Sequence, residues 1–63
     1  MSTFEERYAQ LTDLVEGAEE DLMKFYDKGN KAAGTRARKN MMELKKLAHE
    51  IRKEIQEIKN TEL

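Results

Sequence analysis

The stretch Phe25-Tyr26-Asp27-Lys28-Gly29-Asn30-Lys31 decides the fold, because it interrupts an otherwise continuous helical pattern. Gly29 suits the left-handed conformation that ends many helices. Asn30 carries a side-chain oxygen that can cap the N-terminus of the next helix. We therefore predict a helix over residues 3–28, a turn over 28–30 and a second helix over 31–60.

Apolar residues on both sides of this turn recur at alternating steps of four and three. The first series is Phe4, Tyr8, Leu11, Val15, Ala18, Leu22 and Phe25, and the second is Ala37, Met41, Leu44, Ala48, Ile51, Ile55 and Ile58. This spacing is the heptad repeat of coiled coils. Ser2 or Thr3 can cap the first helix, with a glutamate three residues later. The pattern predicts an all-α fold, an antiparallel two-helix hairpin resembling a coiled coil, as one domain over residues 1–63.

Folding the chain back at the turn gives a register for the two helices. It pairs a large side chain with a small one at three levels: Phe25 near Gly34, Ala18 near Met41, and Leu11 near Ala48. Gly34 costs a helix about 1 kcal/mol relative to Ala. It has two explanations, room for the Phe25 ring or close approach of a phosphate, and packing is the favoured one.

Two further rows flank this expected seam. On one side Arg7 is expected to face Glu54, and Leu14 to face Leu47. On the other side, basic residues are expected to pair with Glu5 and Glu19 as a charged border; these bases are Arg38, Lys45, Arg52 and Lys59.

The chain has 63 residues and no Cys, so disulfides cannot stabilise it. A domain this small is marginal on its own, and self-association is the remaining means of stabilisation. We expect two hairpins to form a four-helix bundle, as a dimer or a higher oligomer. The expected oligomer interface comprises Leu14, Leu47, Val15, Leu44 and Ile51.

Charge is unevenly distributed, although the net charge is only −1. Residues 1–28 hold eight acidic and three basic side chains, whereas residues 29–63 hold nine basic and five acidic ones. Such asymmetry indicates an anionic partner or head-to-tail pairing of like molecules. The sequence contains no apolar run of about 20 residues and no signal peptide at its charged start, so we expect a cytoplasmic protein without membrane association.

The basic residues are best organised around the turn and the start of the second helix. No acid occurs between residues 28 and 42, and Lys39, Lys46 and Lys53 recur every seven residues on the outermost row. The outermost row of the first helix is entirely acidic. Solvation of an outer surface is the plain explanation, but phosphate binding is favoured slightly. The candidate phosphate-binding residues are Lys31, Arg36, Arg38, Lys39 and Lys46.

Catalysis is poorly supported by this sequence. His49 is the one histidine, it falls on an outer position, and its helical neighbours are Lys and Arg. We expect no enzyme activity, no catalytic residue, no metal site, no cofactor and no small-molecule substrate.

The segment Lys28-Gly29-Asn30-Lys31-Ala32-Ala33-Gly34-Thr35-Arg36-Ala37-Arg38-Lys39, with the helix after it to about residue 54, resembles the bacterial linker-histone-like (histone H1-like) nucleoid proteins. The resemblance implies non-specific DNA binding, chromosome condensation and a nucleoid-associated location. The basic positions that match the family pattern are Lys31, Arg36, Arg38 and Lys39. Family members commonly continue into a Lys/Ala-rich basic tail, and this sequence instead ends Lys59-Asn60-Thr61-Glu62-Leu63.

Three functions remain open from the sequence. The first is a histone-like DNA-binding protein, acting as a homo-oligomer of helical hairpins on non-specific duplex DNA. The second is a structural or regulatory module that binds another protein through its coiled-coil surface. The third, least supported, is a small RNA-binding hairpin.

Overall fold

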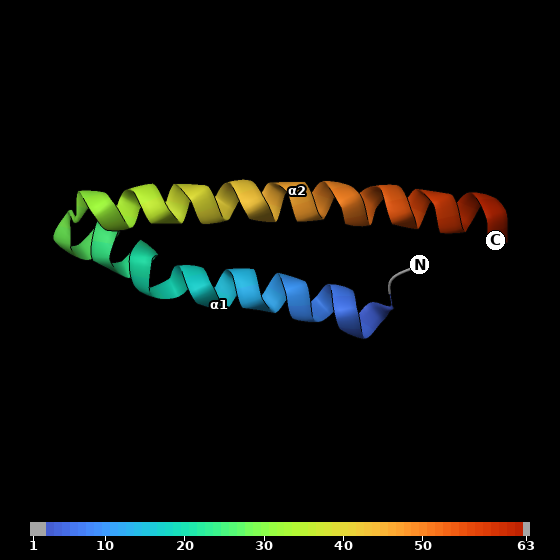
Figure 1. Cartoon of the computed structure of the whole chain (residues 1–63), viewed down its shortest axis with the longest axis horizontal. Helices are drawn as coiled ribbons and strands as arrows, with labels where there is room; N and C mark the ends of the chain where they lie inside the picture. Colours follow the sequence, from blue (N-terminus) through green and yellow to red (C-terminus); the bar gives the residue numbers. More distant parts are fainter. Residues whose placement is uncertain (1–2, 63) are drawn as a thin grey trace.

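The computed structural model describes residues 3–62 and shows two antiparallel helices joined by a short turn (Figure 1). Helix α1 spans Phe4–Lys28 and helix α2 spans Lys31–Glu62. The two helices pack against each other along an elongated molecule of 49 × 17 × 13 Å. Both ends of the chain lie away from the turn, and α2 extends past the start of α1 (Figure 1). The predicted all-α hairpin is confirmed.

The helix ends form where the local sequence predicts them. The Thr3 hydroxyl accepts a hydrogen bond from the Glu6 amide at 3.2 Å, so Thr3 is the N-cap of α1; Ser2 lies outside the described residues. Gly29 adopts φ 65° and its amide donates to the Phe25 carbonyl at 2.9 Å. The Asn30 side-chain oxygen accepts from the Ala33 amide at 3.0 Å. These three local bonds define both ends of α1 and the start of α2.

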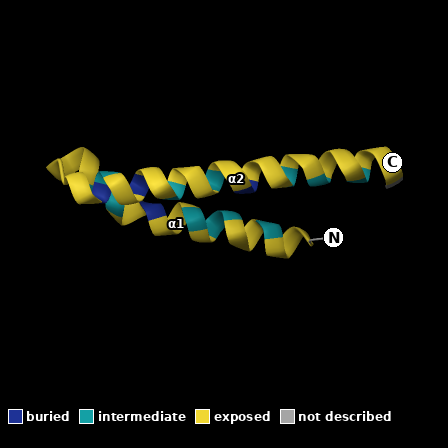
Figure 2. Cartoon of the chain, turned by 45° about the horizontal axis from the view of Figure 1, so that its top comes forward, coloured by how far each residue is buried: buried dark blue, intermediate teal, exposed yellow. Residues whose placement is uncertain are grey.

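Small side chains occupy the contact between the helices near the turn. The buried residues of the described chain are Ala18, Ala33, Ala37 and Leu47 (Figure 2). Gly34 packs directly against the Phe25 ring, as the predicted register requires, and a Cβ at Gly34 would lie 2.6 Å from Phe25 Cδ1. The packing explanation of Gly34 is therefore confirmed. Because the three buried alanines and Gly34 are small, the helices approach closely at this end.

The seam between the helices lies one row away from the predicted one. Tyr8, Val15 and Ile55 belong to the predicted apolar seam, but each is more than half exposed. By contrast, Leu47 is only 8% exposed within a single hairpin. Leu47, which the sequence analysis places at the oligomer interface, is therefore already buried within one hairpin, and the predicted central row points to one open side of the molecule.

Polar contacts explain why this neighbouring row enters the seam. Arg7 binds Glu54 at 3.1 Å, as predicted from the sequence, and also contacts Glu50 at 3.6 Å. The Asn40 amide nitrogen donates to the Leu14 carbonyl oxygen at 2.7 Å. Both contacts connect α1 to α2 on the side of the seam that holds Leu47. They fix the rotation of each helix as well as its register.

Candidate nucleic-acid interface

Helix α2 presents two rows of exposed cations, which we call the basic strip. The inner row is Lys31, Arg38, Lys45, Arg52 and Lys59, and the outer row is Lys39, Lys46 and Lys53. Within each row the residues are seven apart, which is roughly 10 Å along a helix that rises 1.5 Å per residue. The inner row borders the open side of the hairpin. The outer row is turned away from α1, and Met42 and His49 lie between the two rows.

The basic strip is not neutralised within the hairpin. No member of the strip forms an ion pair with any residue in the described range 3–62. Glu43, Glu50 and Glu57 of the same helix lie three or four residues from lysines of the outer row and border it, whereas Glu54 faces α1 and binds Arg7. The strip is therefore a positive surface with acidic residues along its outer edge.

The predicted charged border between the helices is wrong for a single hairpin. Arg38 and Arg52 were expected to pair with Glu19 and Glu5, and neither pair forms among the described residues. The reason is the rotated seam: it turns the inner row and these two glutamates to opposite outer edges of the open side. Lys45 and Lys59, expected in the same border, are likewise exposed and unpaired in this part of the chain.

Arg36 differs from the other candidate phosphate-binding residues. Its guanidinium contacts the Asp21 carboxylate of α1 at 3.0 Å and 3.1 Å. The hydrogen bond to Asp21, with its negative charge, raises the pKa of Arg36 above its ordinary value. Although no acid occurs in the sequence between residues 28 and 42, Arg36 is therefore paired with a carboxylate of the other helix. The remaining candidates, Lys31, Arg38, Lys39 and Lys46, all lie on the basic strip.

Three residues of the inner row are missing from the phosphate-binding residues predicted from the sequence. Lys45, Arg52 and Lys59 continue the seven-residue spacing that Lys31 and Arg38 begin. The spacing is visible in the sequence and could have added them to the candidates. The predicted register instead places them in the charged border with Glu5 and Glu19. Their exposure depends on which row forms the seam, and the repeat alone does not specify it.

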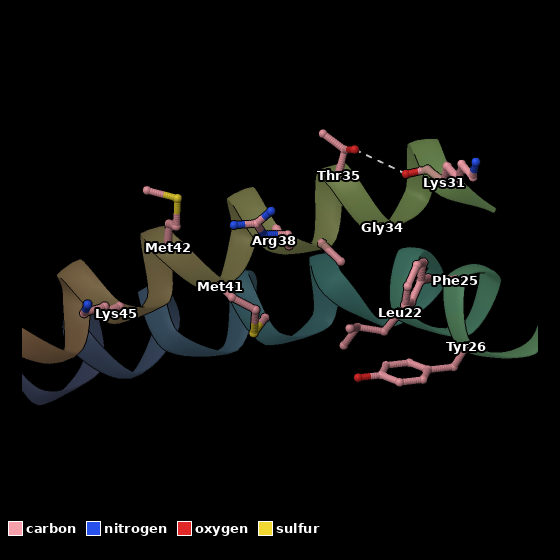
Figure 3. Close-up of a pocket in the computed structure, with 11 residues that line it drawn as sticks. Leu22, Phe25, Tyr26, Lys31, Gly34, Thr35, Arg38, Met41, Met42 and Lys45 are labelled. Carbon is pink, nitrogen blue, oxygen red and sulfur yellow. Dashed lines mark hydrogen bonds between the residues drawn. The ribbon is translucent and has the colours of Figure 1, made fainter. Parts of the chain in front are cut away.

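An open groove of about 640 Å³ lies beside the strip, at the turn end of the hairpin (Figure 3). Its floor and walls are largely apolar, formed by Leu22, Phe25, Tyr26, Ala37, Met41 and Met42. Lys31, Arg38 and Lys45 of the inner row line it as well. The cations of the inner row thus adjoin an exposed apolar surface.

The described residues offer little for other chemistry. His49 is exposed, and no three His, Asp or Glu side chains between residues 3 and 62 gather in a way that could hold a metal ion. Neither described helix carries an apolar segment long enough to cross a membrane.

Comparison with known protein families assigns this hairpin to the class of histone-like proteins. The model of the histone H1-like protein Hc1 family matches residues 5–61, and the chain belongs to this family. A search of curated proteins and a search of solved structures each gave no match. Membership of a histone H1-like family suggests a DNA-binding nucleoid protein. The resemblance noted around the turn therefore extends over nearly the whole hairpin.

Proposed function

We propose that this protein binds duplex DNA without sequence preference, through the basic strip of α2, and contributes to the organisation of the nucleoid in the cytoplasm. The observation that carries this proposal is the row of exposed cations that the described hairpin leaves without an acidic partner. Family membership supports the same function.

The strip has the form that phosphate binding requires. From Lys31 to Lys59 it extends over about 42 Å of helix, which is comparable to about 12 base pairs of DNA. Long Lys and Arg side chains from a straight rod can reach successive phosphates along one side of a duplex. No aromatic side chain is interleaved with the outer row, so the contacts are to the backbone and sequence-independent.

The acidic helix limits the strength of this binding. The outer positions of α1 hold Glu6, Asp13, Glu20 and Asp27, which repel a duplex approaching that side. A single hairpin therefore binds with one side only. Counterion release by a few phosphate contacts makes its affinity depend steeply on salt.

Fluorescence anisotropy with unrelated duplexes over a salt series tests the proposal. The variant Lys39→Gln/Lys46→Gln/Lys53→Gln is expected to bind DNA at least tenfold more weakly at low salt. Because each phosphate contact contributes about 0.9 to the salt slope, the slope should fall by about 2 to 3. Circular dichroism checks that the helices persist.

Lys24→Gln is a matched control for Lys46→Gln, since each removes one positive charge from the chain. Lys24 lies on α1 and contacts Glu20 of the same helix at 2.8 Å, away from the strip. We expect Lys46→Gln to weaken binding several times more than Lys24→Gln. Equal losses, or no binding by the wild-type chain at low salt, would refute the proposed interface.

Homo-oligomerisation and DNA compaction are part of the same proposal. Of the five residues expected at the oligomer interface, Val15 is exposed, whereas Leu14, Leu44 and Ile51 are half-buried and Leu47 is buried. We therefore propose that the oligomer forms through the open side that carries Val15. The mass of the species in solution, with and without DNA, tests this point.

The alternative function, a coiled-coil module that binds another protein, is favoured by one observation. Large apolar side chains are exposed on this small chain, including Phe4 and Tyr26, which are 74% and 77% exposed. A protein partner that stays bound after nuclease treatment would support the alternative. Displacement of bound duplex by structured RNA would instead indicate an RNA-binding hairpin.

A further inference from the structure

One broad side of the hairpin, which we call the open face, is apolar along its centre. Its central residues are Tyr8 and Val15 of α1 and Met41 and Ile55 of α2, and each is between 38% and 56% exposed. They occupy equivalent positions of the heptad repeat, so they form two parallel rows on the same side of the seam. The groove beside the inner row is the turn-end part of this face (Figure 3).

The two edges of the open face carry opposite charges. The α1 edge holds Glu5 and Glu19, and the α2 edge is the inner row of the basic strip. None of these residues forms an ion pair within the described hairpin. An apolar centre with one acidic and one basic edge is self-complementary, because a second copy can present each edge to its opposite.

We propose that a second copy of the chain covers the open face, with a two-fold axis parallel to the helices, so that α1 of each copy lies on α2 of the other. The dimer itself does not depend on the proposed function; only its ability to hold two DNA duplexes does. A two-fold axis in the plane of the face can run along the helices or across them. Across them, α1 meets α1 and α2 meets α2, so acid faces acid and base faces base. Only the axis along the helices brings opposite charges together.

The register of the hairpin then defines the intermolecular pairs. Within one copy, Phe25 lies level with Gly34 and Arg7 lies level with Glu54. A rotation about an axis parallel to the helices leaves these levels unchanged. Glu19 of one copy therefore lies within about one helical turn of the level of Arg38 of the other, and the same holds for Glu5 and Arg52.

The size of the face is adequate for a stable dimer. The broad side of a molecule measuring 49 × 17 Å has about the area that each partner buries in a standard interface, about 800 Å². The resulting assembly is a four-helix bundle with the exposed apolar rows in its centre.

This dimer has two DNA-binding sides. The outer row, Lys39, Lys46 and Lys53, points away from the open face and stays exposed when that face is covered. The two-fold axis places the outer rows of the two copies on opposite sides of the bundle. In this dimer the inner row faces the acidic edge of the partner, so the outer row makes the DNA contacts. The dimer can therefore hold two duplexes at once, one on each outer row, whereas a single hairpin can hold one along its whole basic strip.

Charge reversal tests the arrangement. Glu5→Lys/Glu19→Lys and Arg38→Glu/Arg52→Glu each place like charges opposite each other and are expected to weaken the dimer about tenfold or more. Combining all four substitutions in one chain restores opposite charges and should restore the dimer. Sedimentation equilibrium measures the mass, and circular dichroism confirms that each variant is helical.

The outcomes separate the possible arrangements. If α1 lay on α1, neither double variant would lose mass relative to the wild type, because like charges would face each other in all of them. That result would overturn the proposal. A wild-type chain that stays monomeric would also overturn it and would indicate that a different protein covers the open face.

A covalent test uses the absence of cysteine from the sequence. Under mild oxidation, a mixture of the Glu19→Cys and Arg38→Cys variants is expected to give a disulfide-linked heterodimer in high yield. A mixture of Glu19→Cys with Glu16→Cys serves as the control. Equal yields from the two mixtures would contradict the arrangement.

A bridging assay connects the dimer to DNA. The wild type should retain a labelled duplex on beads that carry an unlabelled one, and Glu5→Lys/Glu19→Lys should bind each duplex but not bridge them. Bridging by a variant that is monomeric would overturn the inference. If the mass and crosslinking results hold but the wild type binds no DNA, the proposed function fails while the dimer arrangement stands.

Discussion

The ring of Phe25 fills the space that a side chain at position 34 would occupy. A Cβ on Gly34 would lie 2.6 Å from Phe25 Cδ1 and 2.9 Å from Cε1, closer than atoms in proteins pack. Any larger residue at position 34 would therefore have to displace the Phe25 ring. The contact accepts a helix-weakening residue in exchange for packing against an aromatic ring, although Phe25 as a whole stays 43% exposed.

This contact predicts that Gly34→Ala destabilises the wild type but stabilises a chain that lacks the Phe25 ring. In the wild type, Gly34→Ala is expected to lower the free energy of unfolding by about 1 kcal/mol or more, because overpacking outweighs the gain in helix propensity. In a Phe25→Ala background the same substitution should raise it by about 1 kcal/mol. Urea denaturation followed by circular dichroism measures both values.

Gly17 provides the matched control, because a Cβ there would meet only Asn40 Nδ2, at 3.9 Å. Gly17→Ala should stabilise the chain by about 1 kcal/mol in either background. A stabilising Gly34→Ala in the wild type would contradict the packing role of Gly34.

The turn depends on the left-handed conformation of Gly29, whose φ is 65°. Gly29→Ala is expected to lower the free energy of unfolding by about 1 to 2 kcal/mol, since a Cβ is disfavoured in this conformation. Gly29→Asn should cost less, because Asn tolerates it better. Thermal unfolding of the two variants gives the comparison, and an equal loss for both would argue against conformational strain as the cause.

The bond from Asn40 to the Leu14 carbonyl connects the two helices at 2.7 Å. Asn40→Ala is expected to cost about 1 kcal/mol of stability, the typical contribution of one hydrogen bond. Asn60→Ala is the control, since Asn60 is exposed and bonds only within α2, to Gln56. Its effect should stay within about 0.5 kcal/mol. Similar losses from both variants would show that the interhelical bond contributes nothing measurable.

Asp21 holds Arg36 against α1 and so competes with DNA for its charge. Asp21→Asn is expected to strengthen DNA binding severalfold and to increase the salt slope by about 1, as Arg36 becomes available to a phosphate. Asp13→Asn removes the same charge from α1 away from Arg36 and should change the slope little. If the two variants behave alike, Arg36 makes no phosphate contact. Adding Arg36→Gln to Asp21→Asn should then leave the salt slope unchanged.

Local chemistry explains why much of this fold was predictable. Thr3, Gly29 and Asn30 each act through bonds to residues three or four positions away, so their roles follow from their immediate neighbours. The level pairing of Phe25 with Gly34, and of Arg7 with Glu54, follows from the position of the turn. The sites were less predictable, because pairing of a cation depends on which carboxylate the other helix brings near it.

Sequence alone determined the helices, the turn, their register and the rows of like charge on each helix, because these features repeat along one chain and depend on local bonds. Only the tertiary structure decided which row faces the other helix. The apolar row at the centre of the predicted seam is flanked by a second usable row that contains Leu14, Asn40 and Leu47, and the heptad spacing fits either. Small residues near the turn and the polar bonds of Arg7 and Asn40 favour the second row, since they let the helices approach closely with their half-buried polar groups paired. That rotation exposes the basic strip and leaves an apolar face open beside it.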